Sequence, residues 1–553
     1  MEMKTINARL LAKAFLGAST NLDNHKEWIN ELNVFPVPDG DTGTNMTATI
    51  ASAAHAVEEL GSEAAMKDIC KAISSGSLRG ARGNSGVILS QLFRGFCKIS
   101  RDYSELNVQI LCEAMQRACE TAYKAVMKPK EGTILTVARA AADKALEMAA
   151  QTDDVLVFSD AVIKEAERVL AQTPDMLPVL KQAGVVDSGG QGLVEVLKGA
   201  FIVLSGGQVE AKAVEIQTEA AYAYRLRFKV VSAMLVTGDQ VSDLRHKIMK
   251  GRECQVTGNA NSISVEIECD DPGQVISIAM DYGVLHQVHL HSNPNSKAVQ
   301  AREGKEALTE QASSERAEEE KKESSCSESS AESAKEIAFV AVSVGEGMND
   351  VFRQLGCDHI ITGGQTMNPS TEDILSAIEK TNARNIIVLP NNKNIIMAAK
   401  QAADLTEGKR VVVIPTKTVP QGITAMINFI PDQSLEDNQN RMMEEIALVK
   451  TGQITYAVRD TLIDNKQIHQ GDFMGIGDDG IISVDADLNR AFHQMIDAMV
   501  DEESSIISIY FGQDASEEDA NALAEQTRQR HPQVEVEVQN GGQPVYCYVV
   551  SVE

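Results

Sequence analysis

The stretch NVFPVPDGDTGTNM occupies residues 33–46 and places two carboxylates, Asp39 and Asp41, on either side of one glycine. In a loop, carboxylates with this spacing can converge on one or two metal ions, and Mg²⁺ prefers hard oxygen ligands of this kind. Two prolines stiffen the approach, and Thr44 or Asn45 begins a helix whose free N–H groups favour an anion. The same spacing also fits a capped turn before a helix, because Asp and Gly are common in turns.

Three further glycine-rich loops lie in the same part of the chain, namely GARGNSG at 80–86, EGT at 131–133 and DSGGQG at 187–192. Each precedes a pattern typical of a helix, and the backbone N–H groups of such loops can cradle phosphates. Arg79 or Arg82 can add positive charge to the first of these loops. The sequence contains no Walker A pattern, so it predicts no P-loop. Four polar loops on a helical domain can together form the rim of one nucleotide site. Ordinary connections between helices would give the same sequence pattern.

The composition of the chain narrows the class of protein. With 553 residues, of which 43% are hydrophobic, the chain is long enough for about two to four domains. A net charge of −28 and an aromatic content of 4% argue against nucleic acid and anionic membranes as partners. The nine cysteines form no Cys-x-x-Cys pair, which indicates reduced thiols in a cytoplasmic protein. We expect neither a signal sequence nor a membrane span, because no apolar segment of suitable length occurs.

The apolar periodicity divides the chain into three domains and a linker. Residues 1–208 repeat apolar positions at three- and four-residue spacing, which predicts an all-α domain. Residues 215–295 follow the order β-α-β-β-α-β, which is the ferredoxin-like pattern. Residues 296–336 are of low complexity and rich in Ser and Glu, which predicts an acidic linker without a core. Residues 337–553 predict an α/β domain, and its first four apolar runs, which helical segments separate, predict a parallel sheet at 337–344, 359–362, 386–390 and 411–415. Further strand candidates follow them.

Residues 33–46, GARGNSG at 80–86 and VVDSGGQG at 185–192 together closely resemble the fatty acid kinase ATP-binding subunit family (FakA). The resemblance covers nearly the whole chain, in domain order and in length. The first domain is similar to DhaL, the ATP-binding domain of dihydroxyacetone kinase. This similarity implies an antiparallel barrel of helices with the nucleotide at one mouth, and ATP and Mg²⁺ as cofactors.

The resemblance also implies roles for individual residues. Asp39 and Asp41 match the magnesium ligands, whereas Asn33 lies near the position of a third acidic ligand in DhaL. The residues that match nucleotide- and phosphate-contacting positions are Thr42, Thr44, Asn45, Asn84, Ser85, Gly86, Gly132, Thr133, Asp187, Ser188 and Gly189.

The family implies a kinase that phosphorylates a fatty acid carboxylate, presented by a fatty-acid-binding partner (FakB, of the DegV type), to an acyl phosphate. An acyl carboxylate is itself a nucleophile, which agrees with the lack of an evident catalytic base. Loops at 363–371 and 415–422 resemble motifs of the partner-docking domain, and a homodimer is a family expectation. Two alternatives remain, a dihydroxyacetone-type kinase acting on small ketoses and a nucleotide-sensing scaffold without enzymatic activity.

The middle domain departs from the family pattern. Related proteins often carry a zinc site here, but the matching positions are Arg225, Glu266 and Glu268, and Arg cannot ligate zinc. Glu266 and Glu268 share one strand face at about 7 Å, so we expect an ionic cluster in place of zinc. The glycine pattern at 475–480 precedes a predicted strand, so we interpret it as a hairpin turn and not as a dinucleotide site.

Overall fold

The computed structural model separates the chain into two compact units, Met1–Ala211 with Ser333–Glu553 and Lys212–Glu332. Asp39 and nearly all of the predicted linker at 296–336 lie outside the residues that the structure describes. The described residues are 2–34, 40–61, 64–126, 128–211, 224–231, 243–244, 247–248, 254–258, 262–269, 272–280, 282–292, 335–364, 367–457, 461–463, 466–478 and 480–553.

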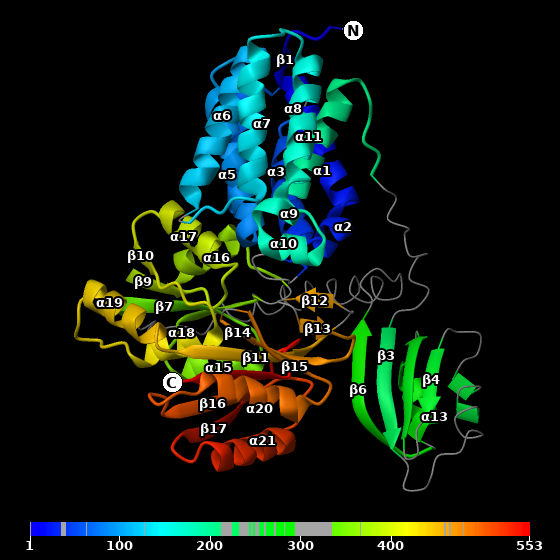
Figure 1. Ribbon diagram of the computed structural model, residues 1–553, viewed down its shortest axis with the longest axis vertical. Helices are drawn as coiled ribbons and strands as arrows, with labels where there is room; N and C mark the ends of the chain where they lie inside the picture. The colour runs from blue at the N-terminus through cyan, green and yellow to red at the C-terminus, as the bar shows by residue number, and fades with distance from the viewer. Residues whose placement is uncertain are drawn as a thin grey trace, which may run out of the picture. The chain divides into compact units, whose positions relative to one another are not determined.

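The part of the first unit that precedes residue 212 is a bundle of helices, as the sequence predicts (Figure 1). One short antiparallel pair of strands, β1 (Ile6–Asn7) with β2 (Glu105–Leu106), joins the segment before the first helix to one of the helix connections. The helices are α1 (Ala8–Asn24), α2 (Lys26–Glu31), α3 (Thr42–Glu58), α4 (Met66–Arg79), α5 (Gly83–Ser100), α6 (Val108–Ala125), α7 (Ile134–Ala149), α8 (Val155–Leu170), α9 (Thr173–Met176), α10 (Pro178–Ala183) and α11 (Ser188–Leu204).

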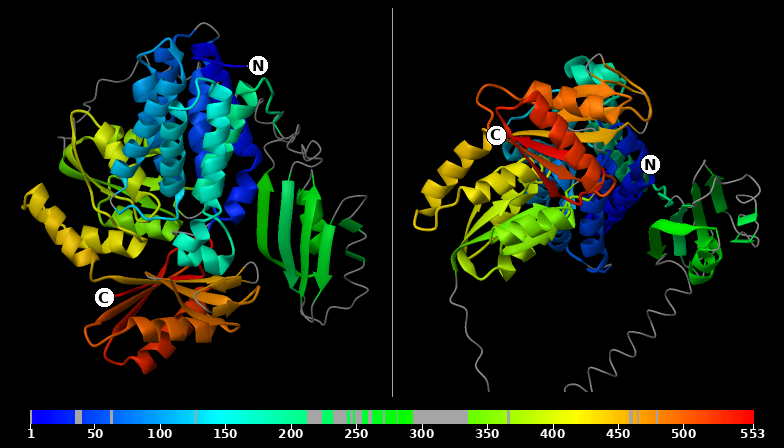
Figure 2. Two further views of the ribbon diagram at one scale, coloured as in Figure 1. Left: turned by 45° about the horizontal axis from the view of Figure 1, so that its top comes forward. Right: turned by 90° about the horizontal axis from the view of Figure 1, so that it is seen from below.

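Polar side chains decide where several of these helices begin. Asn7 Oδ1 accepts the N–H of Leu10 at 2.9 Å, and Asn107 Oδ1 accepts the N–H of Ile110 at 3.0 Å. Such caps satisfy N–H groups that the first turn leaves without a partner. The apolar faces then pack in one shared core, in which α1 and α11 run side by side (Figures 1 and 2). Among the described helices, none is both long and apolar enough to cross a membrane.

The C-terminal part of the same unit begins with a parallel sheet in the order β10-β9-β7-β8. Its strands appear in the sequence as continuous apolar runs, because helices cover a parallel sheet on its faces. An α/β fold is therefore confirmed for this part (Figure 2). The elements are β7 (Lys335–Ser343), α15 (Glu346–Gln354), β8 (His359–Thr362), α16 (Thr371–Lys380), β9 (Ala383–Leu389), α17 (Ile396–Leu405), β10 (Arg410–Val413), α18 (Val419–Ile427) and α19 (Leu435–Ile446).

A second sheet follows in the order β15-β14-β11-β18-β16-β17. Among the described strands of this sheet, β16 and β17 pair in parallel and the other four neighbouring pairs are antiparallel. The predicted turn at 475–480 is confirmed, since it joins β14 to β15. The elements are β11 (Lys450–Tyr456), β12 (Thr461–Ile463), β13 (Lys466–Ile468), β14 (Phe473–Gly477), β15 (Gly480–Asp485), α20 (Leu488–Met499), β16 (Ile506–Phe511), α21 (Glu517–Arg530), β17 (Glu535–Asn540) and β18 (Tyr548–Val552).

The second unit contains a four-stranded antiparallel sheet in the order β4-β5-β3-β6. Alternate residues of its strands are buried, as Leu226, Phe228 and Val230 show. Most of the helix predicted at 239–250 lies outside the described residues, so the ferredoxin-like assignment stays a prediction. The elements are β3 (Tyr224–Val231), β4 (Cys254–Gly258), β5 (Ser262–Cys269), α13 (Pro272–Met280) and β6 (Val284–Ser292).

Candidate functional site

At the start of α3, the side chain of Asp41 does not cap the helix. Asp41 occupies the N-cap position, where a carboxylate usually accepts an N–H of the first turn. Here the N–H of Thr44 is donated to Asn30 Oδ1 at 3.1 Å, and Asn30 Nδ2 donates to Thr44 Oγ1 at 3.0 Å. Asp41 makes no side-chain cap. Because Asn30 takes over the capping role, the Asp41 carboxylate is available to another group.

The group that binds the Asp41 carboxylate belongs to the C-terminal part of the first unit. Asn368 Nδ2 donates a hydrogen bond to Asp41 Oδ2 at 2.6 Å. Asn368 is 4% exposed and lies between β8 and α16, in the loop at 363–371 that the sequence associates with partner docking. The sequence alone missed this contact, because 327 positions separate the two residues.

The glycine loop at 80–86 lies directly against the first turns of α3. Gly83 has a φ of 58°, and a Cβ at this position would lie 2.5 Å from Asn45 Nδ2. A Cβ on Gly86 would lie 2.3 Å from Thr49 Oγ1. A side chain at either position would therefore push the loop away from α3.

The structure corrects the extent of this loop. Since the positive φ of Gly83 turns the chain directly into α5, Asn84, Ser85 and Gly86 lie in the first turn of the helix. The N-cap residue, Arg82, provides no side-chain cap. An uncapped helix start with its N–H groups directed outward is an arrangement that binds anions.

The third and fourth loops meet at Thr173, the first residue of α9. Thr173 Oγ1 accepts the N–H of Asp187 at 3.1 Å, and a Cβ on Gly132 would lie 3.2 Å from the Thr173 carbonyl oxygen. The fourth loop also reaches α3, because the Ser188 hydroxyl donates to Thr42 Oγ1 at 3.2 Å. The described parts of the four loops that the sequence singled out therefore lie next to one another and form a rim at one end of the helical bundle.

Asp187 is buried and stabilises this rim through a hydrogen bond to the backbone. Its Oδ2 accepts the N–H of Gly190 at 2.7 Å, which caps the start of α11. Burial raises the pKa of Asp187 to about 6, although its hydrogen bonds to backbone N–H groups act in the opposite direction. The carboxyl group thus fixes the Ser188 and Gly189 backbone, and its own oxygens are not at the surface.

The rim offers oxygen ligands and helix N–H groups, which fits magnesium and phosphate. Within the described ranges, no group of three or more His, Cys, Asp or Glu side chains could hold a metal, but Asp39 is not among these residues. Of the predicted site residues, Thr44 is exposed and Asp41, Asn84, Ser85 and Thr133 are half-buried. The buried members are Thr42, Asn45, Gly86, Gly132, Asp187, Ser188 and Gly189.

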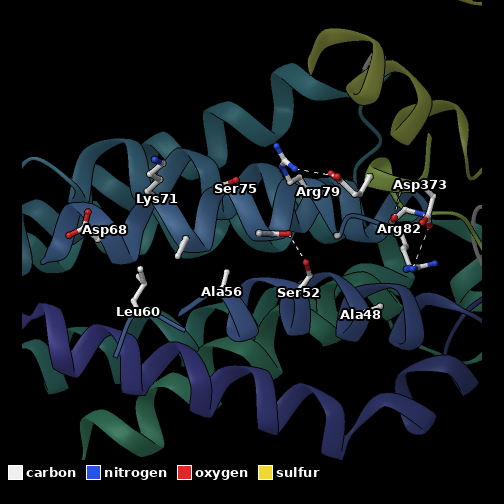
Figure 3. A pocket seen from close by; sticks show the side chains of 15 residues that line it. Ala48, Ser52, Ala56, Leu60, Asp68, Lys71, Ser75, Arg79, Arg82 and Asp373 are labelled. Atoms are coloured by element: carbon white, nitrogen blue, oxygen red, sulfur yellow. Dashed lines mark hydrogen bonds and ion pairs between the residues drawn. The ribbon is translucent and has the colours of Figure 1, made fainter. Parts of the chain in front are cut away.

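A pocket of about 870 Å³ lies beside the glycine loop, lined by α3, α4 and the start of α16 (Figure 3). Arg79 and Arg82, which the sequence suggests as positive charge for phosphate, pair with carboxylates of α16. Arg79 Nη1 lies 3.2 Å from Glu372 Oε1, and Arg82 Nη2 lies 3.6 Å from Asp373 Oδ2. These ion pairs offset the positive charge that the two arginines bring to this side of the rim.

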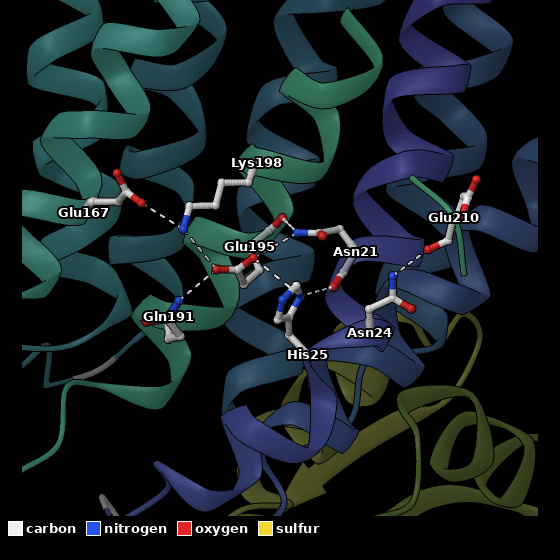
Figure 4. A network of polar contacts seen from close by, with 8 residues as sticks. All are labelled: Asn21, Asn24, His25, Glu167, Gln191, Glu195, Lys198 and Glu210. Carbon is white, nitrogen blue, oxygen red and sulfur yellow. Dashed lines mark hydrogen bonds and ion pairs between the residues drawn. The ribbon is translucent and has the colours of Figure 1, made fainter. Parts of the chain in front are cut away.

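A buried polar network fixes α11, and with it Ser188, to the rest of the bundle (Figure 4). Glu195 Oε2 accepts from Asn21 Nδ2 of α1 at 3.0 Å. Glu195 Oε1 accepts from Gln191 Nε2 at 3.0 Å and from Lys198 Nζ at 3.3 Å. The paired carboxylate is 4% exposed and holds the rim end of α11 against α1.

Comparison with known proteins finds matches to two family models. Residues 36–201 match the family model of the DAK2 domain, and residues 338–553 match that of the FakA-like C-terminal domain of fatty acid kinase. The fold and these matches define a multidomain protein of a kinase-related class, with a helical DAK2 part and a C-terminal α/β part.

Full-length relatives then identify the family. Protein YloV of Bacillus subtilis is 40% identical, and the alignment covers 100% of both chains. The uncharacterized protein SH1689 of Staphylococcus haemolyticus is also 40% identical, over 99% of both chains. The chain belongs to the FakA-like fatty acid kinase family.

A solved structure of a DegV family protein from Thermus thermophilus, whose title describes fatty acid binding, aligns with 39% of this chain and 99% of its own. The TM-score is 0.29 and the identity is 14%, so the likeness is too weak to carry an argument.

Proposed function

We propose that this chain is the ATP-binding, phosphoryl-transferring component of a two-protein fatty acid kinase. The observation that carries the proposal is the Asp41 carboxylate, which is excluded from helix capping at a rim that also contains the uncapped start of α5. Asp39 and Asp41 would hold Mg²⁺, and the first-turn N–H groups of Asn84 and Ser85 would bind phosphate oxygens. Bound Mg²⁺ supplies positive charge that offsets the charge of the transferred phosphoryl group.

The proposed acceptor is a fatty acid carboxylate that a DegV-type partner presents. A carboxylate oxygen attacks the terminal phosphorus of ATP, the bond to the bridging oxygen breaks, and acyl phosphate and ADP result. This reaction requires no general base, because the acceptor is already ionised near neutral pH. Family membership and the two-part organisation of the chain support this assignment.

The proposal is tested by measuring ATP consumption with a fatty-acid-loaded DegV-type partner, with dihydroxyacetone and without an acceptor. We expect turnover only with the loaded partner. Asp41→Asn should lower turnover by about 100-fold or more, because loss of a magnesium ligand removes several kcal/mol of charge stabilisation. Asp39→Asn should behave in the same way.

Asp160→Asn is the matched control, because Asp160 is a carboxylate on α8 that pairs with Lys164 at 2.7 Å. It should retain full turnover. Turnover with dihydroxyacetone alone would favour the small-ketose kinase, and nucleotide binding without any turnover would favour the scaffold. Full activity in both the Asp39 and the Asp41 variant would remove the magnesium assignment.

For the middle unit we propose a zinc-free, ferredoxin-like domain that supports a homodimer in the cytoplasm. The strand register supports the ionic cluster, since Arg225 on β3 lies directly opposite Glu268 on β5 and Arg227 lies opposite Glu266. The side chains themselves lie outside the described set. Tightly held zinc at one ion per chain, lost on changing Glu266 or Glu268, would contradict the proposal.

A further inference from the structure

Asn368 is held in place by its backbone from two sides. The loop before it leaves β8 through Gly363, whose N–H is donated to the Ser343 carbonyl oxygen at 3.1 Å. The chain after it enters α16 through a capping box in which Ser370 and Asp373 bind each other's backbone N–H groups. These bonds restrain the backbone on both sides of Asn368.

The helical bundle also forms hydrogen bonds to the loop that contains Asn368. Arg82 Nη1 donates to the Asn368 carbonyl oxygen at 2.8 Å, and the N–H of Thr371 is donated to the Ala81 carbonyl oxygen at 3.0 Å. Both bundle residues come from the short connection that leads into α5. The connection that presents the proposed phosphate-binding turn is therefore the same one that fixes the backbone of Asn368.

The side chain of Asn368 then reaches the acidic loop. An amide N–H can only donate, so Asp41 Oδ2 is the acceptor of this 2.6 Å hydrogen bond. Carboxylates that ligate metals are commonly oriented by hydrogen bonds of this kind from neighbouring residues. With its capping role taken by Asn30, Asp41 has Asn368 as the side chain that orients it.

We propose that Asn368 is a positioning residue that orients the Asp41 carboxylate for Mg²⁺, so that the C-terminal α/β part completes the nucleotide site of the helical part. This role rests on the proposed function and adds a positioning residue to its magnesium site. It assigns to one residue of the C-terminal part a role in metal binding that is separate from any role in docking a partner.

The test measures metal affinity in the full-length chain, independently of turnover. A non-hydrolysable ATP analogue is titrated by calorimetry at a series of Mg²⁺ concentrations and again without metal. We expect Asn368→Ala to weaken Mg²⁺ binding by roughly tenfold or more, because loss of a residue that orients a ligand has effects of that size. Nucleotide affinity without metal should stay unchanged.

Glu372→Gln is the matched control, since it removes the ion pair with Arg79 from the same contact surface and leaves Asn368 bound to Asp41. It should bind Mg²⁺ like the wild type. An equal loss in this variant would overturn the inference, because it would show that loosening the surface is sufficient. Unchanged or tighter Mg²⁺ binding in Asn368→Ala would overturn it as well.

If Asn368→Ala also lowers stability, a double-mutant cycle with Asp41→Asn still tests whether Asn368 acts through Asp41. In an Asp41→Asn background, Asn368→Ala should cause no additional loss of Mg²⁺ affinity, because the residue acts through the Asp41 carboxylate. An additive loss would overturn the inference. Failure of the wild type to bind Mg²⁺ with nucleotide would instead reject the proposed function itself, and the inference with it.

Discussion

Two aspartates, Asp41 and Asp187, occupy N-cap positions, but of these two only Asp187 caps its helix with its side chain. Asp187 accepts the N–H of Gly190 and is buried, so its carboxylate stabilises the start of α11. Asp41 makes no cap, because Asn30 accepts the N–H that it would otherwise bind. The same residue type at the same helix position is thus structural in one loop and open to a ligand in the other.

Asp187 should make the stability of the protein depend on pH. Its pKa is about 6 in the folded state, compared with 3.8 as the reference value, so between these values the folded chain holds a proton that the unfolded chain has lost. The free energy of unfolding therefore falls as pH rises through this window, by about 3 kcal/mol in total. Asp187→Asn cannot titrate, so it should gain stability relative to the wild type between pH 4 and pH 7.

The measurement is the thermal unfolding midpoint of both proteins at several pH values. Other ionisable groups contribute equally to the two proteins, so the difference between them isolates Asp187. A difference that stays constant with pH would show that the burial of Asp187 does not perturb its titration.

Gly83→Ala should damage the rim as well as the fold. An alanine at a positive φ costs about 1–2 kcal/mol of stability, and at Gly83 its Cβ would also meet the Asn45 amide at 2.5 Å. Gly184→Ala is the control, because Gly184 has a similar φ of 68° with no atom within 4 Å of its Cβ. Both variants should lower the free energy of unfolding, but only Gly83→Ala should weaken nucleotide binding. Equal nucleotide affinity in the two variants would argue against a role of this turn at the site.

At the scale of elements, α11 depends on a buried carboxylate for its position. Glu195 accepts hydrogen bonds from α1 and from two side chains of α11 itself. A buried charge costs free energy unless it is paired, and here each carboxylate oxygen has a donor. The network therefore holds the middle of α11 against α1.

Glu195→Ala should lower the free energy of unfolding by about 3 kcal/mol, because Gln191 and Lys198 lose their buried carboxylate acceptor and Asn21 keeps only the Glu195 carbonyl oxygen. Glu167→Ala removes a partner of the same Lys198 at the surface, at 2.8 Å, and should cost less than about 1 kcal/mol. Chemical denaturation of both variants measures the two values. Equal costs would show that burial of the Glu195 carboxylate contributes nothing.

At the scale of the first unit, the helical and α/β parts share an apolar core. Ala81 and Val87 of the bundle pack in the same buried cluster as residues of β7, β9, α16 and α17. Gln401 Nε2 of α17 donates to the Leu78 carbonyl oxygen at 2.6 Å, and Gln91 Nε2 donates to Gln401 Oε1 at 3.2 Å. Shared burial of this kind couples the unfolding of the two parts.

Val87→Asp should uncouple the two parts, because it buries a charge where the side chain is 2% exposed. In the wild type, the thermal transition reported by Trp28, the single tryptophan, should coincide with the main transition in far-UV circular dichroism, to which the second unit can add a smaller one. In the Val87→Asp variant, the Trp28 transition should no longer coincide with the main one. Val157→Asp, at a position that is 51% exposed on α8, should leave the two coincident. A wild-type Trp28 transition that differs from the main one would contradict the coupling.

Much of the secondary structure follows from local patterns that the sequence contains. Three- and four-residue apolar spacing predicts the helices before residue 212, and apolar runs predict β7 to β10, since each element buries its own periodic face. Less follows for the second sheet, whose pairing directions depend on strands far apart in the chain, and for the short strands β12 and β13, which pair with each other. The sequence also places the first turn of α5 in a loop, because a glycine pattern alone does not show where the helix begins.

By itself, the sequence determined the family, the helical and α/β parts and the four loops that carry the candidate site, because these depend on residue types within a few positions of one another. Only the tertiary structure decided that Asp187 is a buried cap, that Asp41 is not a cap, and that Asn368 binds Asp41. These facts depend on which distant atoms packing brings within hydrogen-bond distance, and neither the spacing of Asp and Gly nor the composition of a loop specifies that.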